Sequence, residues 1–190
     1  MIVLIGASAS GKSEIAKMLC TSFHYQKCVT TTTRPKRPKE RDGIDYHFVS
    51  KEVFQRLQAA NAFLEVTEYH HNLYGLQKKD ALRHGLVIVD PNGANALLAV
   101  LQEEAFIVLI EADEDVRRKR MLARGEPEAQ VEERIALDRT VFQRQHLHRI
   151  HLVIKNNGDQ PLFSICQTIH ESYDQHMKHQ QEKTLASRQL

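Results

Sequence analysis

The most constraining feature of the chain lies near its start. Residues 6–13 read GASASGKS, which matches the pattern G-x-x-x-x-G-K-[ST]. An unbroken apolar run at residues 2–5 precedes the pattern and is typical of a buried parallel strand, while apolar residues at helical spacing follow over residues 14–20. A strand, a glycine-rich loop and a helix in this order are the context that the pattern requires. We therefore expect an α/β fold built around this loop.

Each fixed position of the loop has a physical reason. Gly6 and Gly11 permit backbone angles that side chains forbid, so successive N–H groups can converge on phosphate oxygens at the positive end of the next helix. Lys12 would reach the outer phosphates, and the Ser13 hydroxyl would complete the shell of a magnesium ion bound to them. A glycine-rich turn without a ligand is the alternative, but such a turn does not demand a Lys-Ser pair. The predicted nucleotide-phosphate site is Gly6, Ala7, Ser8, Ala9, Ser10, Gly11, Lys12 and Ser13.

Composition narrows the class of protein. The 190 residues are 42% hydrophobic and 26% charged, with a formal net charge of +2. This length fits one domain with a full core, and the small net charge gives no support for a nucleic-acid or membrane partner. Apolar stretches fall short of the roughly 18 residues that span a bilayer, and no basic leader precedes the first strand. We expect a cytoplasmic protein with reduced cysteines.

Apolar runs alternate with helix-like segments along most of the chain. The runs lie at 86–89, 106–110 and 152–154, and the helix-like segments at 94–102, 114–124, 127–146 and 162–176. This alternation predicts a parallel sheet between layers of helices.

Residues 33–76 break the alternation. A basic turn region is followed by short strand candidates at 46–49 and 63–69, which flank a helix at about 51–60. The segment therefore indicates a small inserted α+β subdomain. It places Arg34 and Arg37 among hydroxyl groups and before Tyr46, a composition that suits anion binding because arginine forks match phosphate oxygens. A solvated basic loop is the alternative for such a run.

A longer pattern bears on this choice. Its elements are Thr32-Thr33-Arg34, Arg37, Glu40, Gly43, Asp45-Tyr46, Phe48-Val49-Ser50, Phe63-Leu64-Glu65 and Asn72-Leu73-Tyr74-Gly75. Together with residues 6–13 upstream, this pattern resembles the guanylate kinase family over roughly residues 1–170. The joint pattern is far more specific than the glycine-rich loop alone.

The resemblance implies a three-layer P-loop fold with a parallel five-stranded sheet, an inserted α+β monophosphate-binding subdomain and a helical lid. The expected parts are a core at 1–29, 77–116 and 145–175, the monophosphate-binding subdomain at 30–76, the lid at 117–144, and a polar tail at 176–190. The tail has little to pack, so we expect it to fray or to extend the last helix.

The resemblance also implies roles for residues of the insertion. Arg34, Arg37, Tyr46 and Tyr74 fall where the family grips the phosphate of GMP, and Thr30 and Glu65 fall where it contacts guanine. The assignment of Glu65 makes chemical sense, because a carboxylate accepts at once from the N1–H and amino groups that guanine presents side by side. A surface carboxylate on a strand is the alternative for Glu65.

Arginines follow on a predicted helix. Arg117, Arg120 and Arg124 share one face at i, i+3 and i+7, and Arg134 and Arg139 come after a Gly-Glu-Pro break. Two phosphates about 4 Å apart repel by several kcal/mol, so transfer between them needs cations. The resemblance implies that Arg120, Arg124 and Arg134 close over the site and act with Lys12 and Arg34 in catalysis. The alternative is a solvated helix face that is ion-paired with Glu114, Asp115, Glu132 and Glu133.

Two positions depart from the family pattern, and the resemblance implies that both lie in the acceptor pocket. After Tyr74-Gly75 the family has a Ser or Thr that helps to read guanine, and this chain has Leu76. After the strand ending at Asp90 the family has a second acid, and this chain has Asn92. Asp90 itself ends a predicted strand at the sheet edge where ligands bind, so we expect it to orient magnesium-bound water or the acceptor nucleotide. Capping of the next turn is the alternative.

The histidines and Asn156 are the remaining polar residues that could have a function. None of the sets formed by the eleven histidines has convincing metal-ligand spacing, so we expect no native metal site there. Asn156 follows the last predicted strand, where the family contacts the adenine of ATP, although a polar turn explains it equally well.

The resemblance finally implies an activity. It is the ATP-dependent phosphorylation of GMP or dGMP to GDP or dGDP by in-line transfer, with magnesium on the ATP phosphates, in a monomer or homodimer. A kinase of the same fold for another phosphorylated acceptor, such as a different nucleotide or a sugar phosphate, stays open because of Leu76 and Asn92. A non-catalytic guanylate-kinase-like binding module also stays open, although the Lys12-Ser13 pair opposes it.

Overall fold

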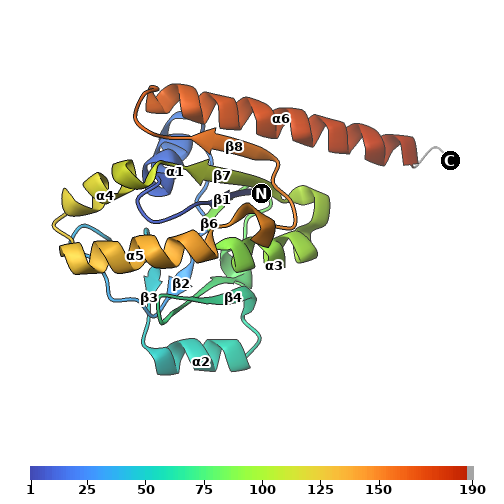
Figure 1. Cartoon of the computed structure of the whole chain (residues 1–190). Coiled ribbons are helices and arrows are strands. Elements are labelled where there is room, and N and C mark those ends of the chain that lie inside the picture. The colour runs from blue at the N-terminus through green and yellow to red at the C-terminus, as the bar shows by residue number, and fades with distance from the viewer. Residues whose placement is uncertain (188–190) are drawn as a thin grey trace.

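The computed structural model describes residues 1–187, which form two β-sheets and six α-helices. Figure 1 shows the larger sheet in the middle of the molecule and the smaller sheet with α2 below it. Short 3-10 helices connect some elements, at Lys78–Asp80, Gln102–Glu104 and Arg144–His146.

The larger sheet is built from the predicted apolar runs. Its strands are β1 (Ile2–Ile5), β6 (Leu86–Ile88), β7 (Phe106–Glu111) and β8 (Leu152–Lys155). They are parallel and lie in the order β6-β1-β7-β8, with Val3 opposite both Val87 and Ile107. All four residues of β1 are buried, as an unbroken apolar run predicts for a central parallel strand.

The expected count of five strands is corrected to four strands and one bridge. Beyond β6, Lys27 pairs with the sheet through an isolated parallel bridge to Leu86. The Cys28 N–H donates to the Leu86 carbonyl at 2.8 Å, and the Leu86 N–H donates to the Gln26 carbonyl at 2.8 Å. The ladder stops there because the chain leaves this edge and enters the smaller sheet at Thr31.

Helices cover both faces of the larger sheet. Ile2 and Leu4 pack into one core cluster with α1 (Lys12–Ser22) and α6 (Leu162–Ser187). Val3 and Ile5 point to the opposite face and pack against α3 (Pro91–Leu101). Because each buried aliphatic side chain contributes about 1.5–3 kcal/mol, these two clusters fix the carboxyl edge of the sheet and the loop that leaves β1. The three-layer architecture is thus as predicted.

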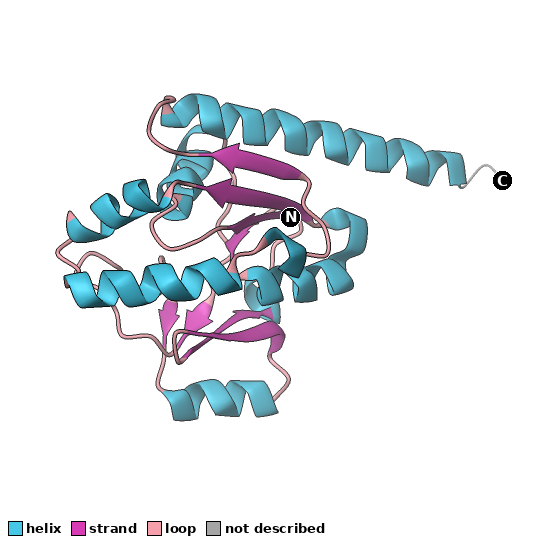
Figure 2. Cartoon of the chain, viewed as in Figure 1, coloured by secondary structure: helices cyan, strands magenta, loops and turns pink. Residues whose placement is uncertain are grey.

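The inserted segment forms the smaller sheet, which Figure 2 shows as a separate group of strands. Its strands are β2 (Thr31–Thr32), β3 (His47–Phe48), β4 (Phe63–Tyr69) and β5 (Asn72–Gln77), in the order β3-β2-β5-β4. Helix α2 (Lys51–Ala59) begins at Ser50, whose side chain accepts from the Val53 N–H. Phe54 of α2 stacks on Phe63 of β4 with ring centroids 4.6 Å apart, which joins the helix to the sheet.

Two helices lie at one side of the molecule, where α4 (Glu114–Leu122) packs against α5 (Glu128–Val141). Gly125 ends the first of them in the left-handed region at φ 80°. The second ends at Val141, earlier than the expected 146, because the backbone becomes extended at Gln143.

The last helix is long and continuous. Helix α6 runs from Leu162 to Ser187, so the polar tail extends the helix over its described part, and residues 188–190 lie outside the described residues. Figure 1 shows the carboxyl half of α6 projecting past the other elements. Within residues 1–187, no helix has both the length and the apolar character that a membrane crossing needs.

Candidate functional site

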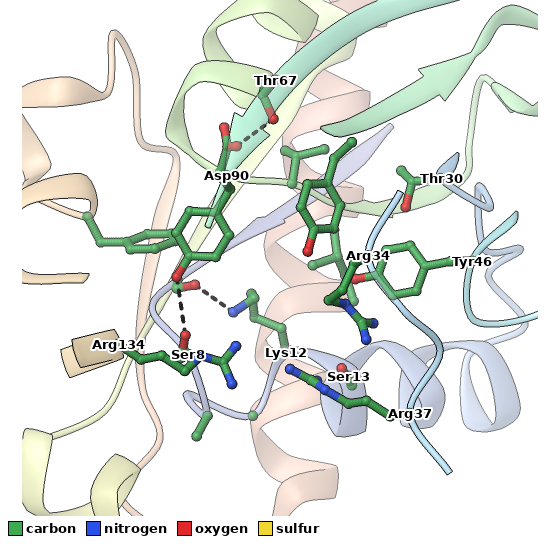
Figure 3. Close-up of a pocket in the computed structure, with 18 of the residues that line it drawn as sticks. Ser8, Lys12, Ser13, Thr30, Arg34, Arg37, Tyr46, Thr67, Asp90 and Arg134 are labelled. Atoms are coloured by element: carbon green, nitrogen blue, oxygen red, sulfur yellow. Dashed lines mark hydrogen bonds between the residues drawn. The ribbon is translucent and has the colours of Figure 1, made fainter. Parts of the chain in front are cut away.

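One cavity brings together most of the residues predicted from the sequence (Figure 3). It is lined by loop 6–13, by the smaller sheet, and by residues of α5 and of the segments that follow α4 and α5. The predicted residues that line it are Gly6, Ser8, Ala9, Gly11, Lys12, Ser13, Thr30, Arg34, Arg37, Tyr46, Glu65, Tyr74, Asp90, Arg124 and Arg134. The predicted residues outside its lining are Ala7, Ser10, Arg120 and Asn156.

The two glycines of the loop are required by close approaches. A Cβ atom at Gly6 would lie 2.2 Å from the carbonyl oxygen of Ile110, and one at Gly11 would lie 2.2 Å from Nδ2 of Asn156. Gly11 also has φ 101°, in the left-handed region that side chains disfavour. The loop can therefore pass between β7 and the turn after β8 only with glycine at both positions.

Donors hold the carbonyl groups of the loop. They are Lys12 Nζ to the carbonyls of Gly6 at 2.5 Å and Ala7 at 2.9 Å, Arg117 to Ser8 at 3.4 Å, Arg120 to Ala9 at 3.2 Å, and Asn156 Nδ2 to Ser10 at 2.9 Å. Helix α1 begins at Lys12, so the N–H groups of its first turn lack intrahelical partners. The loop thus presents N–H groups and a helix N-terminus to an anion. In this arrangement Arg120 and Asn156 shape the loop from outside the cavity.

Cations surround the space in front of the loop. Figure 3 shows the side chains of Lys12, Arg34, Arg37 and Arg134 around this space. Burial lowers the pKa of Lys12 to about 8; Asp138 opposes this shift, and nearby arginines, Arg134 foremost, add to it. Burial likewise lowers the pKa of Arg37, with Arg34 and Arg134 contributing. These cations repel one another, and an anion in the space between them would stabilise their charged forms.

Arg34 is held in place on the acceptor side. Its guanidinium donates to Glu40 at 2.7 Å and lies over the ring of Tyr46, 5.4 Å from the centroid. Tyr46 in turn meets Tyr74 edge-on, with centroids 6.1 Å apart. Arg34 and the two tyrosines therefore form one packed wall of the cavity.

Glu65 is a buried carboxylate that faces the same cavity. Its side chain accepts from the Leu76 N–H at 2.8 Å through Oε1, while Oε2 has no hydrogen-bond partner within residues 1–187. Burial raises the pKa of Glu65 to about 7; the Leu76 N–H opposes this shift, and Asp90 adds to it. A buried oxygen without a donor is costly, so the geometry of Glu65 calls for a ligand that donates hydrogen bonds.

The two departures from the family pattern do not place side chains in the cavity. Leu76 is fully buried in the core cluster on the α3 face of the larger sheet, and only its N–H reaches Glu65. Asn92 is exposed on the first turn of α3 and lines a separate surface groove with Asn95 and His146. The description of both as changes within the acceptor pocket is therefore corrected.

Asp90 is engaged by the protein itself. Its Oδ1 accepts from the Gly93 N–H at 2.9 Å and caps α3, and its Oδ2 accepts from the Thr67 hydroxyl at 2.5 Å (Figure 3). The capping alternative is thus the observed arrangement, and each carboxylate oxygen keeps a lone pair for a further partner. Ser13 is exposed at the cavity beside Lys12, and its hydroxyl fits a magnesium ligand.

The arginines singled out after residue 113 differ in their surroundings, and Arg120 is the one described above at the Ala9 carbonyl. Arg124 and Arg134 line the cavity, and Arg134 also donates to Glu126 at 2.6 Å. Arg117 is buried in an ion pair with Asp138 at 2.9 Å. Arg139 lies on the surface and pairs with Glu114, which is the ion-paired alternative for this residue.

Sequence reasoning did not assign several residues at or behind the cavity, of which four have polar or aromatic side chains that bear on its geometry. Thr67, Tyr69 and Phe142 line it, and Asp138 lies buried behind it. Period-two alternation from Glu65 along β4 would have found Thr67 and Tyr69, and the i+4 position from Arg134 on α5 would have found Asp138. No equivalent sequence signal exists for Phe142, whose ring lies 5.9 Å from Lys12 Nζ just after α5 ends.

A metal ion can also be held by side chains alone, without help from a nucleotide. Within the described part of the chain, no group of three or more His, Cys, Asp or Glu side chains is arranged to hold a metal ion.

Comparisons with known proteins agree with this geometry. A family model described as guanylate kinase matches residues 1–173. Curated guanylate kinases are similar in sequence: one from Helicobacter hepaticus is 33% identical over 83% of this chain and 82% of its own length, and one from Nitrosomonas europaea is 31% identical over 83% and 81%. For a guanylate kinase from Nitratidesulfovibrio vulgaris, identity is 37% over 66% of this chain, and the match spans 64% of that relative.

Solved structures support the fold. A crystal structure of guanylate kinase from Anaplasma phagocytophilum superimposes with a TM-score of 0.68 at 23% identity, covering 91% of this chain and 84% of the other. A gluconokinase from Sinorhizobium meliloti gives a TM-score of 0.55 at 17% identity over 96% and 95%. At these identities the likeness concerns architecture alone.

Proposed function

Because this chain belongs to the guanylate kinase family, we propose that it transfers the terminal phosphoryl group of ATP to GMP or dGMP. One observation carries the proposal: a single cavity is lined by a phosphate-binding loop on one side and by buried Glu65 on another, with cations between them, and Oε2 of Glu65 has no hydrogen-bond partner within residues 1–187. A carboxylate that lacks donors suits guanine, which offers two donors side by side.

The donor nucleotide would lie on residues 6–13. Their N–H groups and Lys12 would bind its phosphates, and Asn156 would keep the loop in shape through the Ser10 carbonyl. Magnesium, held by Ser13 and the ATP phosphates, would neutralise charge on the phosphate oxygens when bound. Asp90 accepts one hydrogen bond on each oxygen, from Thr67 and from Gly93, and would use its remaining lone pairs to orient magnesium-bound water or the acceptor nucleotide.

The acceptor would lie against the smaller sheet. Its base would face Thr30 and Glu65, with Asp90 behind them, and its phosphate would meet a wall of Arg34, Arg37, Tyr46 and Tyr74. The side chains of Glu65 and Thr30 are 5% and 4% exposed, so little water competes for the hydrogen bonds to the base.

Transfer needs no covalent intermediate on the protein. The acceptor phosphate would attack in line, while Lys12, Arg34 and the lid residues Arg124 and Arg134 stabilise the charge spread over the transferring group. Arg120, whose Nη1 donates to the Ala9 carbonyl at 3.2 Å, would join them through its remaining N–H donors. Closure of the lid over both substrates would exclude the water that otherwise hydrolyses ATP.

The same family membership supports the assignment of separate functional parts along the chain. We assign the core to 1–29, 77–116 and 145–175, monophosphate binding to 30–76, and the lid to 117–144. We further propose a cytoplasmic enzyme that acts as a monomer or homodimer. Sedimentation of the purified protein distinguishes these two states.

A coupled assay of ADP release tests the activity directly. The purified chain is supplied with ATP, magnesium and one acceptor at a time, chosen from GMP, dGMP, AMP, CMP, UMP and ribose 5-phosphate. We expect turnover with GMP and dGMP at least about 100-fold above that with AMP, since adenine leaves Glu65 unpaired. Turnover with another acceptor in place of GMP would reject the substrate assignment, and the absence of acceptor-dependent turnover would reject the kinase assignment.

A further inference from the structure

A buried network joins three parts of the cavity wall. Asp138 of α5 is 2% exposed and Arg117 of α4 is 4% exposed, and they form an ion pair at 2.9 Å. The same carboxylate reaches the P-loop, where its Oδ2 accepts from the Ser8 N–H at 2.8 Å. Its other oxygen, Oδ1, accepts from the hydroxyl of Tyr69. One side chain of the lid therefore contacts both the donor loop and the acceptor subdomain.

The network fixes the peptide groups on both sides of Ser8. Asp138 holds its N–H, Arg117 approaches its carbonyl at 3.4 Å, and the Tyr69 hydroxyl lies 3.2 Å from its Oγ. The next residue, Ala9, has φ 59°, a left-handed conformation that is unfavourable for alanine. The loop thus adopts a strained backbone directly beside the residue that the network holds, and such strain persists only where surrounding contacts maintain it.

Tyr69 occupies the end of the β4–β5 hairpin. The turn that follows it consists of His70 and His71, both in the left-handed region at φ 50° and 58°. The β5 strand of this hairpin carries Tyr74, and β4 carries Glu65, so the hairpin supplies both the phosphate and the base side of the acceptor pocket. A displacement of Tyr69 therefore moves residues that would touch the acceptor.

We propose that Asp138 and Tyr69 are positioning residues that couple the ATP loop to the acceptor hairpin through the lid. Asp138 touches neither reacting phosphate; it acts by holding Ser8 and Tyr69 at a fixed separation. When ATP orders the loop, the hydrogen bonds through Asp138 order the hairpin as well. This inference rests on the proposed function only in taking residues 6–13 as the ATP site.

Hydrogen exchange measured with an ATP analogue tests the coupling without an acceptor. The probe is non-hydrolysable ATP with magnesium, and the readout is amide exchange in peptides covering residues 67–75. In the wild-type protein we expect saturating analogue to slow this exchange at least about fivefold. Tyr69→Phe removes only the hydroxyl and keeps the ring contact with Phe142, whose centroid lies 5.9 Å away, so the variant should fold. The slowing should fall below about twofold in this variant.

Matched variants separate coupling from a general effect. Tyr25→Phe removes another partly buried hydroxyl, which contacts His170 at 2.9 Å far from the cavity, and should leave the analogue-induced slowing unchanged. Asp138→Asn should abolish the slowing as Tyr69→Phe does, and the double variant should show no further loss, because each single variant already disrupts the Tyr69–Asp138 link between loop and hairpin. Equal slowing in Tyr69→Phe and wild type, or no slowing in the wild type, would overturn the proposal.

The outcome is independent of the acceptor assignment. Turnover with GMP decides the proposed function, whereas the exchange experiment contains no GMP. A wild-type protein that phosphorylates GMP but shows no hairpin response would retain the function and lose the coupling. A hairpin response without GMP turnover would retain the coupling and lose the substrate assignment.

Discussion

The donor loop and the acceptor pocket face one cavity but hold their polar groups in opposite ways. In the loop, five successive carbonyls from Gly6 to Ser10 accept from side chains of the protein. In the acceptor pocket, Oε2 of Glu65 has no partner within residues 1–187, although the residue is only 5% exposed. The fold thus satisfies the carbonyls of the loop, although the buried Ser10 Oγ has no partner within residues 1–187, and it leaves Oε2 of Glu65 without a donor in the pocket.

This difference separates two ways of recognising a nucleotide. Backbone N–H groups on a rigid loop bind phosphate oxygens that every nucleoside triphosphate carries, so they need rigidity rather than selectivity. A buried carboxylate selects a base, because a ligand that cannot donate leaves it unpaired. Burying this carboxylate without a second donor destabilises its ionised form, and the pKa of Glu65 is raised for that reason.

The largest expected effect lies on the donor side. Lys12→Ala removes both the charge at the outer phosphates and the donor to two loop carbonyls, so kcat should fall about 1,000-fold or more. Steady-state kinetics with ATP and GMP measures this loss. Lys17→Ala, an exposed lysine on the same helix, is the matched control and should stay within about twofold. Equal losses in both variants would remove Lys12 from the mechanism.

On the acceptor side, Glu65→Gln should be selective. The amide offers one acceptor in place of two and brings its own donors against guanine, so kcat/KM for GMP should fall about 100-fold while KM for ATP changes little. Glu68→Gln alters an exposed carboxylate three residues further along β4 and should have no effect on either value. A loss shared equally between ATP and GMP would contradict a base-reading role.

These two side chains also show how far the sequence could predict the site. Lys12 and Glu65 both line the cavity, and each lies inside a sequence pattern that singles it out. The strands next to them follow from apolar periodicity. The Arg117–Asp138 pair depends on how α4 packs against α5, which no spacing within one helix encodes. The expected fifth strand is a single bridge at Lys27 for a similar reason, because the point at which the chain leaves the sheet edge depends on the folded structure.

The unsatisfied carboxylate should make stability depend on pH. The pKa of Glu65 is about 7 in the folded protein against 4.5 unfolded, so the folded state binds more protons between these values. Stability is therefore lost as pH rises from about 4.5 to 7, by on the order of 3 kcal/mol from this group. Glu65→Gln removes the titration, and its free energy of unfolding relative to wild type should rise by that amount between pH 4.5 and pH 8.

Urea unfolding at both pH values measures this difference, and comparison of variant with wild type cancels the other titrating groups. A constant difference at the two pH values would show that Glu65 ionises normally in the folded protein. Saturating GMP should restore much of the wild-type stability at pH 8, because the bound base supplies the missing donors. The same addition should do little for Glu65→Gln.

The smallest expected effect lies at the back of the acceptor pocket. Thr67→Val keeps the shape of the side chain and removes the hydroxyl that donates to Asp90 at 2.5 Å, so Asp90 retains only its contact with the Gly93 N–H. Loss of one such hydrogen bond should lower kcat/KM for GMP about fivefold and leave KM for ATP unchanged. Thr168→Val on exposed α6 removes a hydroxyl that bonds to the Ser164 carbonyl and should change neither value. If Thr67→Val instead raised KM for ATP, the Thr67–Asp90 contact would belong to the donor side, and the division of the cavity into a satisfied loop and an unsatisfied pocket would fail at this point.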